Sequence, residues 1–415
     1  MDTRTKPYQT KEERIYRAFA DELKEWSRAG TKPSLGNQDI SYYLELQEER
    51  LKERGLKMEY QMKLRGEHLD KIYSTFYRDP VYTNVFAVSR YLLKTTFFRE
   101  GKTVYERKEP QNFFLTITKM DQQRPEENCC CPNCGVVSPV KELLEGCPHC
   151  HTRFLMSDLF PKVTGYFFQL DFALNSKEYH AKVRKWVIGG ILAIFLLFWV
   201  FALIQGQDFP ILQVLLGSIP VGAFTGYLLM SLNMAVGFFG YAERNMPQFI
   251  RTAGTKGKLS RLLQPYDKSF SYEYFTGRIL SLLKVMIYSD QIKNLAVYVG
   301  EEKIPDCSDI VESVYQGSMR LNRKWMEKGY CYLDLSIDMI NTYDAGRIYR
   351  KNDRFRMVVC KKLRRDSDFG FSIKKVQCGG CGGSFDATRE RFCPYCGREY
   401  YLKDDDWVVV KFHKK

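Results

Sequence analysis

Residues 186–242 constrain the fold of this chain more than any other stretch, because they contain a single charged side chain, Asp208. The uncharged run at residues 186–205 has the length that a helix needs to cross about 30 Å of hydrocarbon. Gly206 interrupts the apolar pattern, and a second uncharged run over residues 209–242 is long enough for another crossing. Because a backbone in lipid must satisfy its own hydrogen bonds, the stretch predicts a transmembrane hairpin of two helices joined by a tight turn.

Two other interpretations of this stretch are a buried hairpin in a soluble core and a signal peptide. A signal peptide lies at the N-terminus, but residues 1–29 are charged throughout. A soluble core helix of this length would carry some polar face, and neither run has one. The transmembrane hairpin is therefore the interpretation that the residues favour.

Basic residues flank both ends of the hairpin, and its turn has none. They are Lys177, Lys182, Arg184 and Lys185 before it, and Arg244, Arg251, Lys256, Lys258 and Arg261 after it. Basic flanks stay in the cytoplasm, so we expect both termini on the cytoplasmic face of a cell membrane that the chain crosses twice.

The net charge of the chain indicates which classes of partner it can attract. The formal net charge is +14, and most of the excess lies in residues 243–415. Beside a membrane this excess favours attraction to anionic lipid headgroups, at about 1 kcal/mol for each Lys or Arg near the surface. Nucleic acid is the other acidic partner that the charge allows.

Two cysteine windows carry the metal chemistry. In the first, Cys131 and Cys134 precede Cys147 and Cys150; in the second, Cys378 and Cys381 precede Cys393 and Cys396. Two residues between paired cysteines let both thiolates reach one ion, and the glycine that follows three of the four pairs lets the backbone fold back. This pattern predicts two zinc ions, each held by four sulfurs, instead of free or disulfide-bonded cysteines.

Four protein ligands leave no open position for water, so both zinc sites are expected to be structural. The register of the first site stays open, because Cys129 or Cys130 can replace Cys131 and His151 can replace Cys150. The other cysteines are expected to be packing residues; they are Cys307, Cys331 and Cys360.

We expect two structural regions before the hairpin. Residues 1–80 predict a helical region, with helices over residues 11–29 and 40–77. Residues 81–180 are rich in β-branched and aromatic side chains and predict a β-rich unit that holds the first zinc ribbon at residues 129–151.

After the hairpin we expect a basic linker over residues 243–271 and then a domain over residues 272–415, with the second ribbon at residues 378–397. Ser271 is the expected N-cap of its first helix. Period-two alternation over residues 332–340 predicts a half-buried strand, whose apolar face is core or, if left open, a groove. Helices followed by antiparallel strands give an α+β fold.

Both cysteine windows have similar surroundings. An apolar strand enters each one, and an acidic residue followed by another apolar strand leaves it, at Asp158 and at Asp406. Each ribbon is therefore expected to be inserted at the tip of a β-hairpin, and the chain is expected to contain a diverged internal duplication.

The helix over residues 272–286, the strand over residues 354–360 and the ending from Cys393 through Trp407 resemble bacterial proteins with a Tim-44-like domain, a branch of the nuclear transport factor 2-like cone fold. The resemblance implies a curved sheet backed by helices around a concave pocket, association with membranes or proteins, and usually no catalysis. The hairpin and the second ribbon depart from the mitochondrial namesake, so a role in protein import is not carried over.

These features predict a membrane-anchored, non-enzymatic interaction or scaffold protein with structural zinc ribbons. The alternatives are a membrane-tethered nucleic-acid-binding protein and a cone-fold enzyme or ligand-binding protein. The ribbon interior at residues 135–146 has one Lys and two Glu, which disfavours the first alternative. The chain has no Gly-rich phosphate loop, nucleophile elbow or His–carboxylate motif, which disfavours the second.

Overall fold

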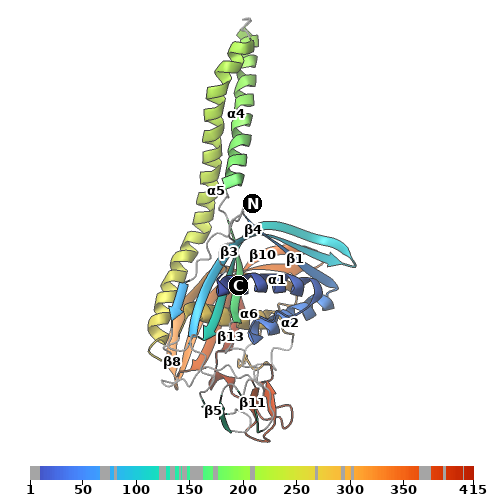
Figure 1. Cartoon of the computed structure of the whole chain (residues 1–415), viewed down its shortest axis with the longest axis vertical. Coiled ribbons are helices and arrows are strands. Elements are labelled where there is room, and N and C mark those ends of the chain that lie inside the picture. Colours follow the sequence, from blue (N-terminus) through green and yellow to red (C-terminus); the bar gives the residue numbers. More distant parts are fainter. Residues whose placement is uncertain are drawn as a thin grey trace, which may run out of the picture. The chain divides into compact units, whose positions relative to one another are not determined.

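The computed structural model divides the chain into two compact units (Figure 1). It describes residues 10–65, 75–78, 82–120, 128–130, 136–139, 142, 147–149, 162–171, 176–205, 211–266, 270–290, 295–300, 303–363, 375–386, 389–404 and 406–415. One unit joins Met1–Leu170 to Arg251–Lys415, and the other is Asp171–Ile250. The α+β class and the two apolar helices are confirmed. The segments before and after the hairpin share one unit, however, instead of forming separate domains.

The N-terminal half of the large unit has two helices and an antiparallel sheet. The helices are α1 (Lys11–Ala29) and α2 (Gln38–Glu53). The sheet contains β1 (Leu56–Leu64), β2 (Thr75–Arg78), β3 (Tyr82–Arg99), β4 (Lys102–Met120) and β7 (Lys162–Leu170), in the order β1-β3-β4-β7, with β2 paired to β3. Two short strands, β5 (Asn128–Cys130) and β6 (Val137–Pro139), pair in the first cysteine window.

Helix α1 has the predicted bounds because both of its ends are capped. The Thr10 side chain accepts a hydrogen bond from the Glu13 amide, and Gly30 ends the helix with a left-handed φ of 74°. The predicted helix over residues 40–77 is wrong. It ends at Glu53, a turn at Gly55 with φ of 61° follows, and strand β1 begins at Leu56.

The reason for this error is a change of period that the sequence contains. In β1 the buried side chains are Leu56, Met58, Tyr60 and Met62, with more exposed residues between them. Alternation with period two places one face of a strand on the core, whereas the helical pattern of α2 stops before Gly55. The predicted helical region of residues 1–80 therefore includes two sheet strands, β1 and β2.

The C-terminal half has a helix and a second antiparallel sheet. The helix is α6 (Tyr272–Tyr288), and the Ser271 side chain caps it as predicted by accepting from the Tyr274 amide. The sheet contains β8 (Ile310–Glu327), β9 (Tyr330–Asp344), β10 (Ile348–Lys362) and β13 (Val408–Lys414), in the order β13-β10-β9-β8. The second cysteine window forms the strands β11 (Lys375–Gln377) and β12 (Ser384–Asp386), and the 3-10 turn η3 (Leu402–Asp404) follows it.

Both halves follow one plan. Each sheet is a meander of four main strands, and each cysteine window lies between the third and fourth strands, which pair antiparallel as β4 with β7 and β10 with β13. An isolated parallel bridge covers the outer edge of each fourth strand, from Gly36 to Val163 and from Tyr298 to Val409. The predicted insertion between paired strands is confirmed for the second ribbon. The first cysteine window also lies between paired strands, its folding as a ribbon stays a prediction, and the common plan supports the internal duplication.

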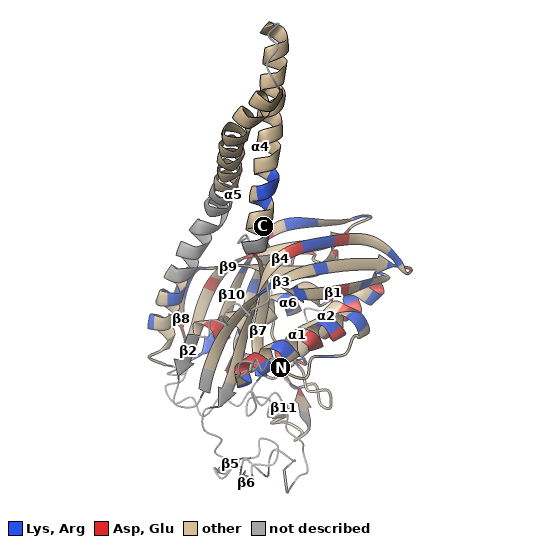
Figure 2. Ribbon diagram, turned by 45° about the horizontal axis from the view of Figure 1, so that its top comes forward, with Lys and Arg blue, Asp and Glu red and all other residues tan. Residues whose placement is uncertain are grey.

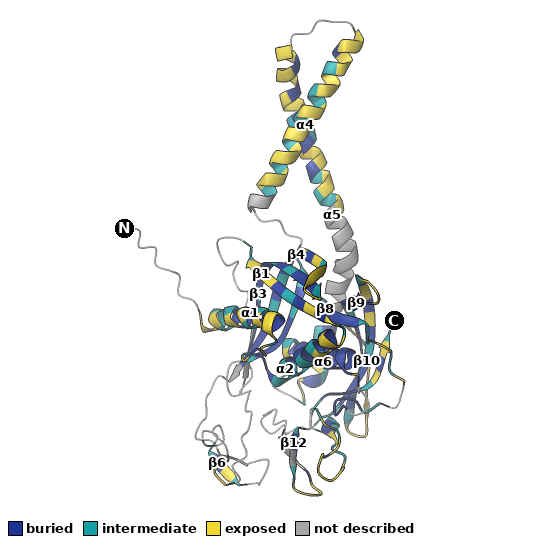
Figure 3. Cartoon of the chain, turned by 90° about the vertical axis from the view of Figure 1, so that its right-hand side faces the viewer, coloured by how far each residue is buried: buried dark blue, intermediate teal, exposed yellow. Residues whose placement is uncertain are grey.

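The two halves interlock where helix α6 crosses strand β7. A Cβ atom added to Gly277 would lie 2.7 Å from the Thr164 carbonyl oxygen, and one added to Gly165 would lie 2.8 Å from Gly277 Cα. Only glycine allows these backbones to approach so closely. Buried residues of both halves form one hydrophobic core, which includes all the apolar inward positions of β9, from Leu333 to Met339 (Figure 3). That strand face is core and not an open groove.

Replacing Gly277 with alanine is expected to destabilise the large unit by about 1–3 kcal/mol, because the added methyl group clashes with the backbone of β7. Thermal unfolding measures the loss. The matched control is Gly254→Ala, since Gly254 is also helical and a Cβ there meets nothing within 4 Å. Alanine favours helix over glycine, so an unchanged or higher unfolding temperature for Gly277→Ala would contradict the close crossing.

The small unit is a helical hairpin of α4 (Ser176–Gln205) and the first part of α5 (Ile211–Leu263). Tyr179–Gln205 and Ile211–Val236 are long and apolar enough to cross a membrane. The helices meet at glycines: added Cβ atoms at Gly190 and Gly222 would lie 2.3 Å from the Gly222 carbonyl oxygen and 2.4 Å from Ile191 Cα. Gly222 and Gly226 form a GxxxG motif, which permits close helix packing in lipid.

The predicted linker over residues 243–271 is mostly helix, because α5 continues without a break to Leu263. Leu259 and Leu263 are buried in the core of the large unit, and Lys256 forms a 2.8 Å ion pair with Glu273 at the start of α6. The basic residues of this segment therefore lie on a helix that is anchored by apolar packing, not on a free connector.

Candidate functional site

The second cysteine window brings four sulfur atoms together. The Sγ atoms of Cys378, Cys381, Cys393 and Cys396 all lie within 4.8 Å of one another. The Cys378–Cys396 and Cys381–Cys393 separations are 3.5 Å and 3.6 Å. Four sulfurs about 2.3 Å from one zinc ion at tetrahedral angles lie about 3.8 Å apart, so the cluster has the size that such an ion requires. This predicted four-cysteine group is confirmed as a candidate metal site.

Two nearly identical turns present these sulfurs. Gly382 and Gly397, which follow the cysteine pairs, both have a left-handed φ of 74°. Their amides donate to the carbonyl oxygens of Cys378 and Cys393 at 2.9 Å and 2.8 Å. The fold-back that the glycines predict is therefore present in both turns.

Backbone amides also favour the thiolate form of the first ligand. The Gly380 amide lies 3.3 Å from Cys378 Sγ. Hydrogen bonds from the backbone amides of Cys381 and Gly380 lower the pKa of the Cys378 thiol to about 6. Because a metal binds the thiolate, this arrangement prepares the sulfur as a ligand, and a site filled by four protein ligands serves a structural role.

The ribbon that holds this site is docked on one face of helix α2. Arg389 forms a 2.8 Å ion pair with Glu45, and its guanidinium lies 4.7 Å from the centroid of the Tyr42 ring. Gln38 donates a 2.8 Å hydrogen bond to Asp386. Since residues 38, 42 and 45 recur at helical spacing, a single stripe of α2 in the N-terminal half receives the C-terminal ribbon.

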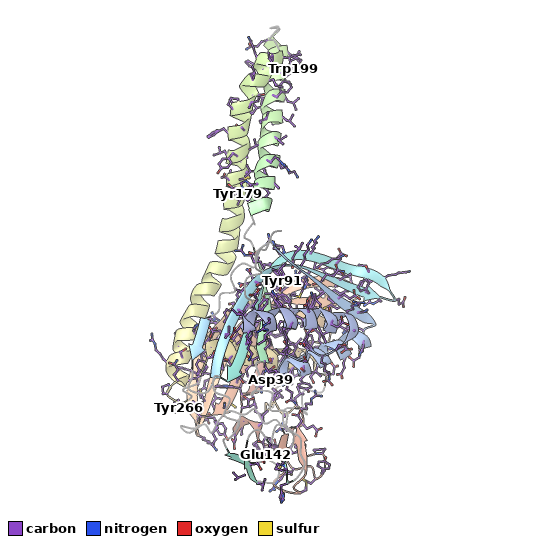
Figure 4. The ribbon with its side chains drawn as sticks, viewed as in Figure 1. Asp39, Tyr91, Glu142, Tyr179, Trp199 and Tyr266 are labelled. Carbon is purple, nitrogen blue, oxygen red and sulfur yellow. The ribbon has the colours of Figure 1, made fainter. Side chains whose placement is uncertain are left out.

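A buried arginine fixes the chain as it leaves the ribbon. Arg278 on α6 pairs with Asp406 at 2.7 Å and with Asp39 on α2 at 2.9 Å; Figure 4 labels Asp39. Asp406, the acidic residue noted in the sequence after the second window, therefore helps to join α6, α2 and the start of β13. Burial lowers the pKa of Arg278, but the two carboxylates raise it further, so the side chain stays charged.

Most of the predicted ligands of the first cysteine window lie outside the part of the chain that the structure describes. Cys131, Cys134, Cys150 and His151 lie outside the described residues, and Cys147 is described and buried. The alternative ligands Cys129 and Cys130 lie on β5, opposite Ser138 and Val137 of β6. In the described part of the chain, no second group of His, Cys, Asp or Glu side chains is close enough to hold a metal ion.

The remaining cysteines are packing residues, as predicted. Cys307, Cys331 and Cys360 are all buried. Burial raises the pKa of each thiol to about 11, so these cysteines stay protonated and are poor metal ligands and nucleophiles near neutral pH.

Sequence reasoning missed an ion pair in the core between the halves. Arg107 on β4 donates two 2.6 Å hydrogen bonds to the carboxylate of Glu312 on β8, which lies 205 residues further along the chain. Tyr60 and Thr342 donate to the same carboxylate at 3.1 Å and 2.7 Å. Burial raises the pKa of Glu312, but Arg107 opposes this and lowers it to about 2. The carboxylate is therefore charged and fully bonded.

Lys284 lies in the same region and is the basic residue that the apolar pattern of α6 conceals. Its Nζ atom lies 4.3 Å and 4.6 Å from the ring centroids of Tyr43 on α2 and Tyr166 on β7. Burial lowers the pKa of Lys284 to about 7, while Glu312 raises it. The two ring faces favour the charged form. This cluster joins both halves, and its only sequence signal is a lysine within an apolar helix.

Comparisons of this chain with protein-family models, with curated proteins and with solved structures find no match.

Proposed function

We propose that this chain is a membrane-anchored, non-enzymatic interaction protein whose large unit docks a protein partner at the cytoplasmic face of the membrane. The observation that carries the proposal is the exposed apolar surface of the hairpin. Most large hydrophobic side chains that are exposed in the described residues lie on α4 and α5, among them Leu197, Ile204 and Phe224 (Figure 3). Only lipid or another apolar partner would cover such a surface.

The charges at the ends of the hairpin support the orientation. Figure 2 shows basic residues at the start of α4, where Lys182, Arg184 and Lys185 precede the apolar run. On the other helix, Lys256, Lys258 and Arg261 follow the second apolar run. By the positive-inside rule, both termini and the whole large unit face the cytoplasm.

Two features of the large unit support a docking function instead of a catalytic one. The four-cysteine site is closed by its own ligands, and the apolar face of β9 is filled by core packing. We propose that zinc occupies this site, because four thiolates in tetrahedral array are its preferred set, and that the first window holds a second zinc. The Tim-44-like resemblance points the same way, since it implies association with membranes or proteins.

Reporter fusions test the anchoring and the orientation together. A reporter fused after Lys415 and one inserted between Gly206 and Asp208 are expected to report opposite sides of the membrane, with the Lys415 fusion in the cytoplasm. Extraction with alkaline carbonate is expected to leave the full chain in the membrane pellet. Release of the chain by carbonate would contradict the anchor, and an external signal from Lys415 would contradict the orientation.

A further inference from the structure

We propose that the end of the C-terminal sheet binds single-stranded nucleic acid through an aromatic–basic face. This face consists of Trp325, Tyr330, Tyr332 and Tyr401 together with Lys328, Lys362 and Lys403. It lies at the β8–β9 turn, beside the end of β10 and the turn η3. The site is separate from the metal centre and does not depend on the proposed anchoring.

The face begins with a stack of two rings. Trp325 lies on β8, opposite Tyr332 on β9, and their rings are parallel within 5° at a centroid distance of 5.1 Å. Trp325 is 38% exposed, and β8 is the edge strand of its sheet. In the described structure no other ring stacks on Trp325. An unpaired base can therefore extend this stack, as bases do on the aromatic side chains of single-strand-binding proteins.

Lysines surround the rings where phosphates would lie. Lys403 Nζ lies 5.1 Å from the centroid of the Tyr330 ring and 5.6 Å from that of Tyr401. Lys362 Nζ lies 5.9 Å from the Tyr330 ring and 4.0 Å from the Asp404 carboxylate, which also accepts a hydrogen bond from the Tyr330 hydroxyl. Asp404 is thus already paired. A second acid, Glu327, lies opposite Tyr330, but the three lysines of the face outnumber the two acids, so the face favours a polyanion that carries flat bases.

The same residue types occur in proteins that bind lipid surfaces, but the turn disfavours that partner. Lys328 and Gly329 form the two-residue turn between β8 and β9, with φ values of 49° and 83°. Glu327 and Lys328 are exposed there, so the tip of the hairpin is charged. A loop that enters lipid presents apolar side chains at its tip. The rings lie on the sheet behind this charged tip, which suits a strand that runs across the sheet.

Fluorescence anisotropy of a labelled oligothymidylate tests the proposal on the full chain in neutral-lipid nanodiscs. Trp325→Ala is expected to weaken binding by roughly tenfold or more, and Trp325→Phe by less, because base–aromatic stacking is lost or reduced. Replacing Lys362 and Lys403 by Gln is expected to lower the slope of log affinity against log salt by about 1.4, since each contact with a single strand contributes about 0.7. The control is Tyr395→Ala, because Tyr395 is 70% exposed on the ribbon but lies outside the face.

Three results would overturn the proposal. The first is that the wild-type chain fails to bind the oligonucleotide at low salt. The second is that Trp325→Ala binds as tightly as wild type while its circular dichroism is unchanged. The third is that polyglutamate or anionic vesicles compete as strongly as the oligonucleotide, and that Trp325→Ala weakens their binding to the chain by the same factor. That result would assign the face to an acidic peptide or to a lipid surface.

Discussion

Replacing Arg107 with methionine is expected to lower the free energy of unfolding of the large unit by about 3–5 kcal/mol. The variant leaves the Glu312 carboxylate, which is 2% exposed, without its counter-ion inside the core shared by the two halves. A buried unpaired charge is among the costliest defects in a protein. This one lies between β4 of the N-terminal half and β8 of the C-terminal half. Denaturant unfolding of the full chain in detergent measures the loss.

Two variants control this experiment. Arg17→Met removes a half-exposed ion pair with Glu13, and we expect a loss of no more than about 1 kcal/mol. Adding Glu312→Gln to Arg107→Met removes the buried charge and keeps one acceptor oxygen for Tyr60 or Thr342, so part of the stability is expected to return. If the double variant is less stable than Arg107→Met alone, the loss does not arise from the unpaired carboxylate.

The pH dependence separates the ion pair from ordinary packing. The folded pKa of Glu312, about 2, is below its usual value of 4.5, so the carboxylate stabilises the folded state above about pH 4.5 and this contribution is lost as the pH falls toward 2. In Arg107→Met the buried carboxyl no longer has its cation and takes up a proton more readily. The stability difference between wild type and Arg107→Met is therefore expected to shrink as the pH falls from 7 to 4. A constant difference would show that the loss comes from packing.

We propose two bound zinc ions, and replacing Cys393 with serine is expected to remove one of them. Metal binding and folding are coupled in small ribbons, where zinc contributes about 10–16 kcal/mol in isolated peptides. Cys393 is 2% exposed and belongs to the small core of the ribbon with Phe385. We expect β11 and β12 to lose protection from hydrogen exchange, and the contacts of Arg389 with α2 to be lost with them.

Elemental analysis of purified chain gives the metal count. Cys307→Ser is the matched control, because Cys307 is also buried but no metal-site sulfur lies with it, and both ions are expected to remain. Cys147→Ser addresses the first window and is expected to remove the other ion. Two ions in purified Cys393→Ser would contradict the four-sulfur assignment, and a ratio of one in wild type would contradict the site in the first window.

The sequence alone determined the features that depend on neighbouring residues. Thr10 and Gly30 cap α1, Ser271 caps α6, and both CxxC pairs of the second window are followed by a glycine that turns the backbone. A cap or a knuckle needs only a few consecutive residues, so its signal survives without knowledge of the fold. The uncharged hairpin is local in the same sense, because length and lack of charge suffice to predict a membrane span.

Only the tertiary structure decided which surfaces meet. The period of residues 56–64 indicates a strand, but only the tertiary structure pairs it with β3. Likewise, α5 extends to Leu263 because the core of the large unit receives its end. The pairing of Arg107 with Glu312 and the glycine contact of Gly277 with β7 join segments that are far apart in the chain. No local pattern specifies such a contact, because its free energy comes from burial and charge compensation that exist only after the two halves have packed together.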